Sequence, residues 1–176
     1  MTTAAAVEAP SWSGEVGGVK DGDTIVVLHD GRGETIRLYG IDAPEKGQDF
    51  GNRAKQTLSE LVFRKVVEIK NMDTDRYGRM VAVVTIGMKT ANEAMVEAGI
   101  AWVFEKYCHK AFCNGWRGLQ EKAKEKRIGL WSHPKPIPPW GFRKHGRRRD
   151  LESDGFNPST DHGLRSNGAS RSCRTS

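Results

Sequence analysis

The sequence VKDGDTIVVLHDGRGETIRLYGIDAPE, residues 19–45, contains two β-type runs at 24–29 and 34–39. The tetrapeptide DGRG separates these runs, and a DG pair separates the first of them from an earlier run at 12–19. Asp-Gly pairs between apolar runs are strong turn signals. We therefore expect the chain to begin as a three-stranded meander.

After the meander, apolar residues recur with a period near 3.6 behind Asp49, which we expect to be the N-cap of an amphipathic helix. Gly99 stands where a left-handed residue would end a later helix. The expected elements are a helix at 49–63, strands at 65–72 and 79–86, and helices at 92–98 and 114–126. Prolines 134, 136, 138 and 139 predict an extended segment, which Trp131 and Trp140 would pin to the domain.

Five strands and three helices in this order fit an α+β architecture, namely a five-stranded β-barrel of the OB type with about three flanking α-helices. The open face of such barrels often binds nucleic acid, although a fold alone does not establish an activity. A length of 176 residues suits one such domain and a tail. We expect a flexible N-terminal segment at 1–11, the domain with its Pro- and Trp-rich closing segment at 12–142, and a basic, disordered tail at 143–176.

Composition restricts the class of protein further. Hydrophobic residues make up 37% of the chain, which excludes wholesale disorder. Charged residues interrupt every apolar run before the roughly 18 to 20 residues that a membrane span needs, so no membrane span is expected. The net charge of +6 favours an anionic partner. Residues 143–176 hold 8 basic and 4 acidic side chains, and this tail could add a salt-sensitive attraction to a polyanion.

Three cysteines are too few for a disulfide scaffold. Cys108 and Cys113 could form a disulfide in an oxidising compartment, stay reduced, or bind zinc with His109 or His133. Zinc is the least favoured, because a second close pair of ligands is missing. The sequence contains no intact signal peptide. Val7-Glu8-Ala9 resembles the end of a cleavage site, so we expect a secreted or periplasmic protein whose signal peptide is not part of this sequence.

Three carboxylates are candidates for chemistry. If Asp23 and Asp42 converge in a curled barrel, they and a main-chain carbonyl offer hard oxygen ligands to Ca²⁺ and leave positions for water and phosphate. The alternative is that each aspartate only stabilises a turn. Glu45 could orient or deprotonate a water that attacks a metal-bound phosphate. Otherwise Glu45 is a solvated loop acid.

Two arginines could bind phosphate. Arg37 lies on the third expected strand, and Arg79 begins the fifth. A guanidinium grips a phosphate through two parallel hydrogen bonds, which a lysine cannot reproduce. The alternative is a surface salt bridge to Asp73, Asp75 or Glu34.

Taken together, four blocks of the sequence resemble the staphylococcal (thermonuclease, micrococcal nuclease-like) nuclease family. They are DT at 23–24, RLYGIDAPE at 37–45, DRYGR at 75–79 and NEAMVEAG at 92–99. The blocks follow the family's order with similar gaps, and the resemblance covers about residues 12–131. It implies an OB-fold phosphodiesterase that cleaves DNA and RNA using Ca²⁺.

The resemblance also implies a role for each candidate residue. The metal carboxylates fall on Asp23 and Asp42, the metal-binding carbonyl on Ala43, the phosphate-gripping arginines on Arg37 and Arg79, and the base on Glu45. The best-known member has Thr where this chain has Ala43, so a carbonyl contact survives and a hydroxyl contact does not. The segment 107–116 also differs, which leaves Tyr77 and Tyr107 only as candidates for stacking on bases.

The sequence thus predicts a Ca²⁺-dependent phosphodiesterase, an endo- or exonuclease that acts on DNA and RNA as a monomer and prefers single-stranded or breathing regions. Two alternatives remain open. One is an OB-fold nucleic-acid-binding module without catalysis. The other is a protein whose basic tail is the functional part, with the barrel as its scaffold.

Overall fold

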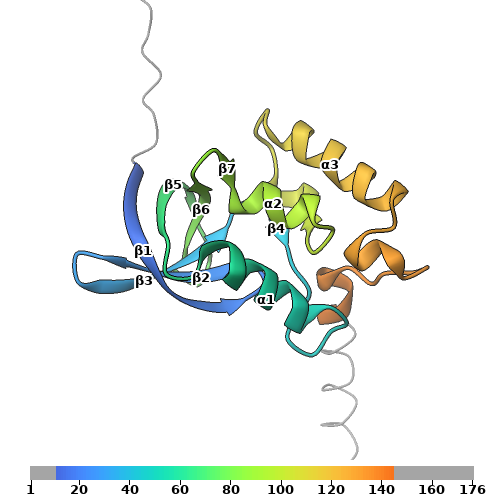
Figure 1. The fold of residues 1–176 in the computed structure, drawn as a ribbon, viewed down its shortest axis with the longest axis horizontal. Coiled ribbons are helices and arrows are strands. Elements are labelled where there is room, and N and C mark those ends of the chain that lie inside the picture. The colour runs from blue at the N-terminus through green and yellow to red at the C-terminus, as the bar shows by residue number, and fades with distance from the viewer. Residues whose placement is uncertain (1–10, 145–176) are drawn as a thin grey trace, which may run out of the picture.

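Runs of β-branched residues form five strands that close into a barrel within residues 11–144, the part of the chain that the computed structural model describes (Figure 1). The barrel strands are β1 (Ser11–Asp21), β2 (Thr24–His29), β3 (Arg32–Leu38), β5 (Val66–Thr74) and β6 (Met80–Ile86). They pair in the order β3-β2-β1-β5-β6, and parallel pairing of β3 with β6 closes the barrel. The predicted α+β, OB-type architecture is confirmed.

Three short strands extend this framework. They are β4 (Ile41–Asp42), β7 (Lys89–Thr90) and β8 (Trp102–Val103). β7 pairs with β6, whereas β4 and β8 pair with each other as a separate two-stranded sheet. β4 therefore ties the chain just after β3 to the helical half of the molecule.

β1 curls because it pairs with both β2 and β5 and carries two register shifts against β2. Such irregularities bend a strand and increase its twist. Gly14 allows a close approach of the backbones, since a Cβ at this position would lie 2.2 Å from the carbonyl oxygen of Leu28. The curl brings the barrel ends of successive strands close enough to share a site.

α1 (Gly51–Val62) buries one face on the barrel through Ala54, Leu58 and Val62. The prediction that Asp49 is its N-cap is wrong. The residue before the helix is Phe50, which has a left-handed backbone with φ of 66° and makes no side-chain cap. Gly51 then starts the helix, because a Cβ there would lie 2.0 Å from the carbonyl oxygen of Glu45.

α2 (Ala91–Glu97) begins one residue earlier than expected, with Thr90 as its N-cap accepting a hydrogen bond from the Glu93 amide. Gly99 has φ of 64° and follows the helix as predicted. Asn92 is fully buried, where it accepts from the Val84 amide and donates to the carbonyl of Tyr39. Asn92 thereby joins α2 to β6 and to the chain just after β3.

α3 (Cys113–Glu125) confirms the expected second long helix and buries Trp116 and Ala123. A disulfide joins Cys113 to Cys108, which answers the open question about these cysteines. Both half-cystines are buried. The disulfide packs against Gly40, where a Cβ would lie 2.6 Å from the Cys108 sulfur.

The proline-rich segment departs from its prediction at its end. Residues 139–144 are helical, which fits Pro139 in a first helical turn, where its missing N–H costs nothing. The predicted pinning by tryptophans is confirmed: Trp140 stacks on Phe104 at 5.1 Å between ring centroids, and Trp131 packs edge-on against Trp102. Residues 1–10 and 145–176 lie outside the described part of the chain, and with them most of the expected flexible segment and basic tail.

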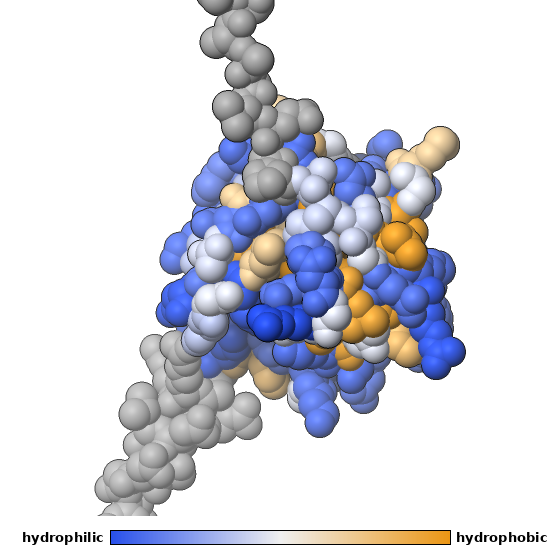
Figure 2. Space-filling model, turned by 90° about the vertical axis from the view of Figure 1, so that its left-hand side faces the viewer, coloured by the Kyte–Doolittle hydropathy of each residue, from blue (hydrophilic) through white to orange (hydrophobic). Residues whose placement is uncertain are grey.

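The surface formed by residues 11–144 is mainly polar on the barrel side. In the view of Figure 2, hydrophilic residues dominate and hydrophobic ones form separated groups among them. None of the helices in residues 11–144 is long and apolar enough to cross a membrane.

Candidate active site

The barrel end formed by β2, β3 and β4 gathers the charged residues that the sequence singles out. Asp23 precedes β2, whose first residue, Thr24, pairs with Arg37 near the end of β3. The chain turns at Gly40, which has φ of 69°, and enters β4 with Asp42. Strand pairing therefore brings Asp23 to the end of β3 that carries Arg37, and the Gly40 turn returns Asp42 to the same end.

Arg37 bridges the two aspartates. Its Nη1 donates to Asp23 Oδ1 at 2.7 Å, and its Nη2 donates to Asp42 Oδ1 at 2.8 Å. Asp23 is 3% exposed and Asp42 is fully buried. Two carboxylates nineteen positions apart in the sequence thus point at one guanidinium group.

The surroundings of Asp23 hold its carboxylate in one orientation. Oδ2 accepts a hydrogen bond from the Ala43 amide at 3.0 Å, and Oδ1 accepts from the Thr24 hydroxyl at 3.0 Å. Burial nevertheless raises the pKa of Asp23 to about 7, against the lowering effect of Arg37. Arg37 therefore does not fully offset the cost of burying the charge of Asp23, and a further cation beside this carboxylate would stabilise its ionised form.

Arg37 responds in the opposite direction. Burial alone would lower the pKa of the Arg37 guanidinium, but the charges of Asp23 and Asp42 raise it above its ordinary value. Arg37 is therefore a permanent cation. Its two bonds to the aspartates use two of five N–H donors and leave three for another anion.

Glu45 lies at the edge of this cluster, in the loop between β4 and α1. Its amide donates to the Gln48 side chain at 3.2 Å, and its side chain is 41% exposed. Glu45 does not contact Asp23 or Arg37 through any hydrogen bond in the described part of the chain. Its carboxylate instead meets the guanidinium of Arg143.

Arg143 is the residue of this site that sequence reasoning missed. It was assigned to the start of the basic tail, whereas the helical turn at 139–144 brings it to the barrel end. Its Nη2 donates to Asp42 Oδ2 at 2.6 Å, its Nη1 donates to Asp42 Oδ1 at 3.3 Å, and Nη1 also donates to Glu45. Burial acts to lower the pKa of Arg143, but these hydrogen bonds raise it. The only sequence signal was the Pro139-Trp140 pair just before it.

Arg79 lies apart from the cluster. Its Nε donates to Asp75 Oδ2 at 2.7 Å, within the turn between β5 and β6. Its guanidinium also lies 5.5 Å from the ring centre of Tyr77, which is 68% exposed. In the parallel pairing of β3 with β6, Arg37 lies opposite Val81, two residues beyond Arg79. Arg79 is thus near the same edge of the barrel but is not joined to the aspartates.

The donor set fits a hard divalent cation. Asp23 and Asp42 offer carboxylate oxygens, and Ala43 follows with a main-chain carbonyl, the ligand types that Ca²⁺ takes. Residues 11–144 contain no group of three or more His, Cys, Asp or Glu side chains arranged around one point. Two carboxylates would leave most of the coordination shell to water and substrate, which suits an open site rather than a closed structural one.

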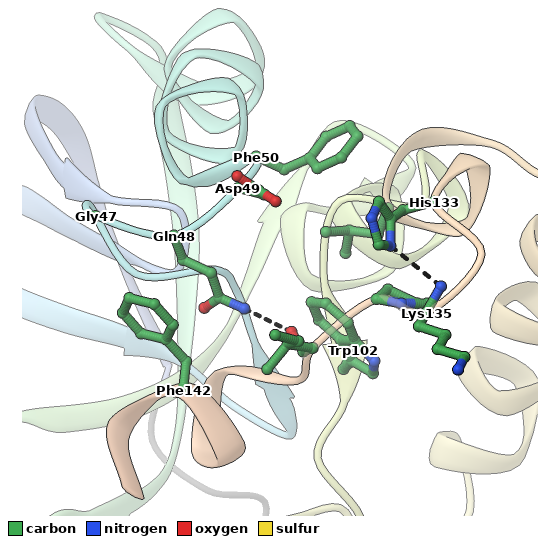
Figure 3. Close-up of a pocket in the computed structure, with 11 residues that line it drawn as sticks. Gly47, Gln48, Asp49, Phe50, Trp102, His133, Lys135 and Phe142 are labelled. Atoms are coloured by element: carbon green, nitrogen blue, oxygen red, sulfur yellow. Dashed lines mark hydrogen bonds between the residues drawn. The ribbon is translucent and has the colours of Figure 1, made fainter. Parts of the chain in front are cut away.

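A separate cavity of about 150 Å³ lies next to the loop that carries Glu45 (Figure 3). Its wall combines residues 47–50 of this loop with Trp102 and the closing segment 133–142. Gln48 holds the two walls together by donating to the carbonyl of Ile137. Neither aspartate lines the cavity, so it is a neighbour of the charged cluster rather than part of it.

Known proteins are similar to this chain in sequence. Residues 35–133 match the family model described as Staphylococcal nuclease homologue. The chain is 42% identical over 155 residues to protein ParB of Escherichia coli, which covers 81% of this chain and 87% of the relative. It is 37% identical over 150 residues to a micrococcal nuclease of Shigella flexneri, covering 78% and 86%. It is 41% identical over 127 residues to an uncharacterized endonuclease of Haemophilus influenzae, covering 72% and 70%. The chain belongs to the staphylococcal nuclease homologue family.

Proposed function

We propose that this protein is a Ca²⁺-dependent nuclease that hydrolyses phosphodiester bonds in DNA and RNA and prefers single-stranded or breathing regions. Membership of the family makes it a hydrolase, and nuclease-named relatives over most of the chain support this class of reaction. The observation that carries the proposal is the bridge from Arg37 to both Asp23 and Asp42 at one barrel end. This bridge combines a cation-binding carboxylate pair with an arginine that can bind phosphate.

Asp23, Asp42 and the Ala43 carbonyl would hold the cation. When bound, Ca²⁺ neutralises charge on a phosphate oxygen and brings a water molecule close to phosphorus. Asp23 and Asp42 are suited to this because burial and fixed hydrogen bonds hold their oxygens in place before substrate arrives. Preorganised groups of this kind need no reorganisation during the reaction.

Glu45 would orient the attacking water and accept its proton as the new P–O bond forms. Its half-exposed side chain suits this role, since water and substrate can reach it. One ester P–O bond of the phosphodiester would break at the same phosphorus, and the departing oxygen would leave with its part of the strand and take a proton from water. Arg37 would use its remaining N–H donors on the phosphate, and Arg79 would approach from the β5–β6 turn. Among residues 11–144, the Arg79 side chain donates to Asp75 through Nε alone, so its terminal nitrogens keep their donors for an anion. Together the two arginines would stabilise charge on five-coordinate phosphorus.

The preference for single strands rests on the position of the site at one end of the barrel and on two exposed aromatic rings. The active site lies on one face of the barrel end, so the backbone of a strand has to be reached from its base-accessible side. Tyr77 and Tyr107 are 68% and 48% exposed and carry nearby cationic groups from Arg76 and Lys106. Bases of an unpaired strand can stack on such rings. Equal cleavage rates on a rigid duplex and on the matched single strand would contradict this preference.

The test is cleavage of single-stranded DNA with Ca²⁺ and with an excess of chelator, using the full chain and the Asp42→Asn variant. Asn is nearly isosteric with Asp but is a weaker ligand for a hard cation. We expect cleavage only with Ca²⁺ and the wild-type chain, and a loss of at least about 10²-fold in the variant. Binding of DNA without cleavage under all conditions would favour a non-catalytic module. Cleavage that survives chelation would contradict the metal requirement.

We also expect a monomer in an oxidising compartment. The buried disulfide between Cys108 and Cys113 supports the compartment, because such bonds persist mainly outside reducing cytosol. Sedimentation of the full chain at micromolar concentration tests the monomer, and a dimer mass would contradict it.

A further inference from the structure

Arg143 lies near the C-terminal end of the described residues, and its guanidinium binds two residues of the proposed catalytic site. It lies 101 positions after Asp42, and its two terminal nitrogens donate to the two oxygens of that carboxylate. The same guanidinium also binds Glu45. One arginine therefore engages a proposed metal ligand and the proposed base together.

These contacts use the atoms that a metal ion would need. Asp42 Oδ1 already accepts from Arg37, and Arg143 adds a bond to Oδ1 and a bond to Oδ2. A divalent ion on Asp42 needs lone pairs of the same oxygens, and its charge would repel a guanidinium at that distance. Arg37 holds Oδ1 of each aspartate, whereas the shorter of the two bonds from Arg143 to Asp42 goes to Oδ2. Arg143 and the ion thus compete for Asp42 Oδ2, an oxygen that Arg37 does not hold.

The segment that carries Arg143 is anchored on the helical half of the molecule. Trp140 stacks on Phe104 with ring planes 3° apart and meets Trp102 edge-on. Arg143 itself keeps a 34% exposed side chain at the rim of the site. Its guanidinium can therefore leave Asp42 by rotation of the side chain while the tryptophan anchor stays in place.

We infer that Arg143 is an internal counter-cation of the active site, which occupies Asp42 and Glu45 until a metal ion displaces it. In this role Arg143 lowers the apparent affinity for Ca²⁺ and sets the metal concentration at which the site opens. The inference rests on the proposed Ca²⁺ site. In an equilibrium of this type, the apparent affinity is the intrinsic affinity multiplied by the fraction of molecules whose site is open.

Calorimetric titration of Ca²⁺ into the full chain, Arg143→Ala and Lys144→Ala tests the competition without using activity. Lys144 is the exposed neighbour of Arg143 and carries the same charge, so its variant controls for a general change in electrostatics. We expect Arg143→Ala to bind Ca²⁺ about tenfold more tightly than the wild type, as for a site open about one tenth of the time. Lys144→Ala should stay within about twofold. Thermal unfolding verifies that each variant is folded.

Equal Ca²⁺ affinity in Arg143→Ala and Lys144→Ala, or weaker binding in Arg143→Ala, would overturn the inference while leaving the proposed function intact. Failure of all three proteins to bind Ca²⁺ would instead contradict the proposed function, and the inference with it.

A second readout follows the side chain directly. In NMR spectra of the wild-type chain, with the Arg143 signal assigned from the Arg143→Lys variant, saturating Ca²⁺ should shift the Arg143 Nε–H resonance and speed its exchange with water. An Arg143 resonance that stays unchanged at saturation would overturn displacement.

Discussion

The barrel side and the loop side of the active site are built differently. On the barrel side, Asp23, Arg37 and Asp42 lie on or beside paired strands, and both carboxylates are buried. On the loop side, Glu45 and Arg143 lie on irregular or terminal segments with side chains 41% and 34% exposed. The barrel side therefore fixes the ligands of a cation, and the loop side can exchange partners as metal and substrate bind.

This difference has an energetic consequence. Removal of one partner from a buried ion pair typically costs about 3–5 kcal/mol, because the other charge stays buried without compensation. An exposed pair contributes about 0–1 kcal/mol, because water screens it. Substitutions on the barrel side should thus affect both stability and rate, whereas those at the exposed edge should affect mainly rate or metal affinity.

The largest effect is expected from Arg37. Arg37→Ala removes the bridge between both aspartates and should reduce the rate on single-stranded DNA by about 10³-fold or more, with a loss of about 3–5 kcal/mol in the free energy of unfolding. Arg37→Lys keeps the charge and should recover much of the stability but little of the rate, since an ammonium cannot bind in the same forked geometry. Rates within tenfold of wild type in folded Arg37→Lys would contradict a phosphate-binding role.

Arg79 provides a second test of the difference between buried and exposed positions, because it is a proposed phosphate ligand outside the buried cluster. We expect Arg79→Ala to lose about 10²-fold in rate, with a change of about 1 kcal/mol or less in unfolding free energy. Arg76→Ala is the matched control, since Arg76 stands in the same turn and also lies over the Tyr77 ring. Initial cleavage rates at saturating Ca²⁺ measure the loss of activity in each variant. A similar loss in both variants would show that only the charge of the turn matters.

The disulfide packs against Gly40, the turn residue that precedes Asp42, and the described contacts of the disulfide do not include the carboxylates of Asp23 or Asp42. The double variant with Cys108→Ser and Cys113→Ser lacks the cross-link between two residues at a sequence separation of 5. This loss should lower the free energy of unfolding by about 2 kcal/mol. Urea unfolding measures this loss. The rate at a temperature where both proteins are folded should change by less than about threefold. A larger loss of rate would mean that the Gly40 turn transmits strain to Asp42.

The last effect concerns stability alone, through pH and a single proton. Burial raises the pKa of Asp23 from 3.8 to about 7, so between these pH values the native protein keeps a proton that the unfolded chain has released. The free energy of unfolding should therefore fall as pH rises through this window, by at most about 1.4 kcal/mol per pH unit, and level off above about pH 7. Urea unfolding in chelator, compared with Asp23→Asn, isolates this slope. A stability difference that rises with pH would contradict the burial of an ionisable Asp23.

Sequence patterns predicted the barrel side well, because strand pairing and turns are local. The Asp-Gly turns and β-branched runs located β2 and β3. The register that pairs Thr24 with Arg37 comes from the structure. The convergence of Asp42 on the same guanidinium depends on the Gly40 turn and on pairing of β4 with β8, which is remote in sequence. The resemblance to a known family suggested this convergence, whereas spacing alone did not.

The loop side was harder to predict. Asp49 looked like an N-cap by residue type, but the approach of the Glu45 carbonyl to Gly51 places a left-handed Phe50 before the helix. Arg143 stands among several arginines near the end of the chain, and the Pro139-Trp140 pair before it is the one local feature that sets it apart. Its place depends on tryptophan packing against β8 and Phe104, a tertiary contact that residue types alone do not reveal.

The most direct measurement is anomalous diffraction from crystals of the full chain grown with Ca²⁺. We expect one strong anomalous peak at the barrel end, within about 2.3–2.6 Å of oxygens from Asp42, Asp23 or the Ala43 carbonyl. Arg37 should remain beside it, and the Arg143 guanidinium should be withdrawn from Asp42. A calcium ion bound elsewhere, with these carboxylates still held only by arginines, would contradict this prediction.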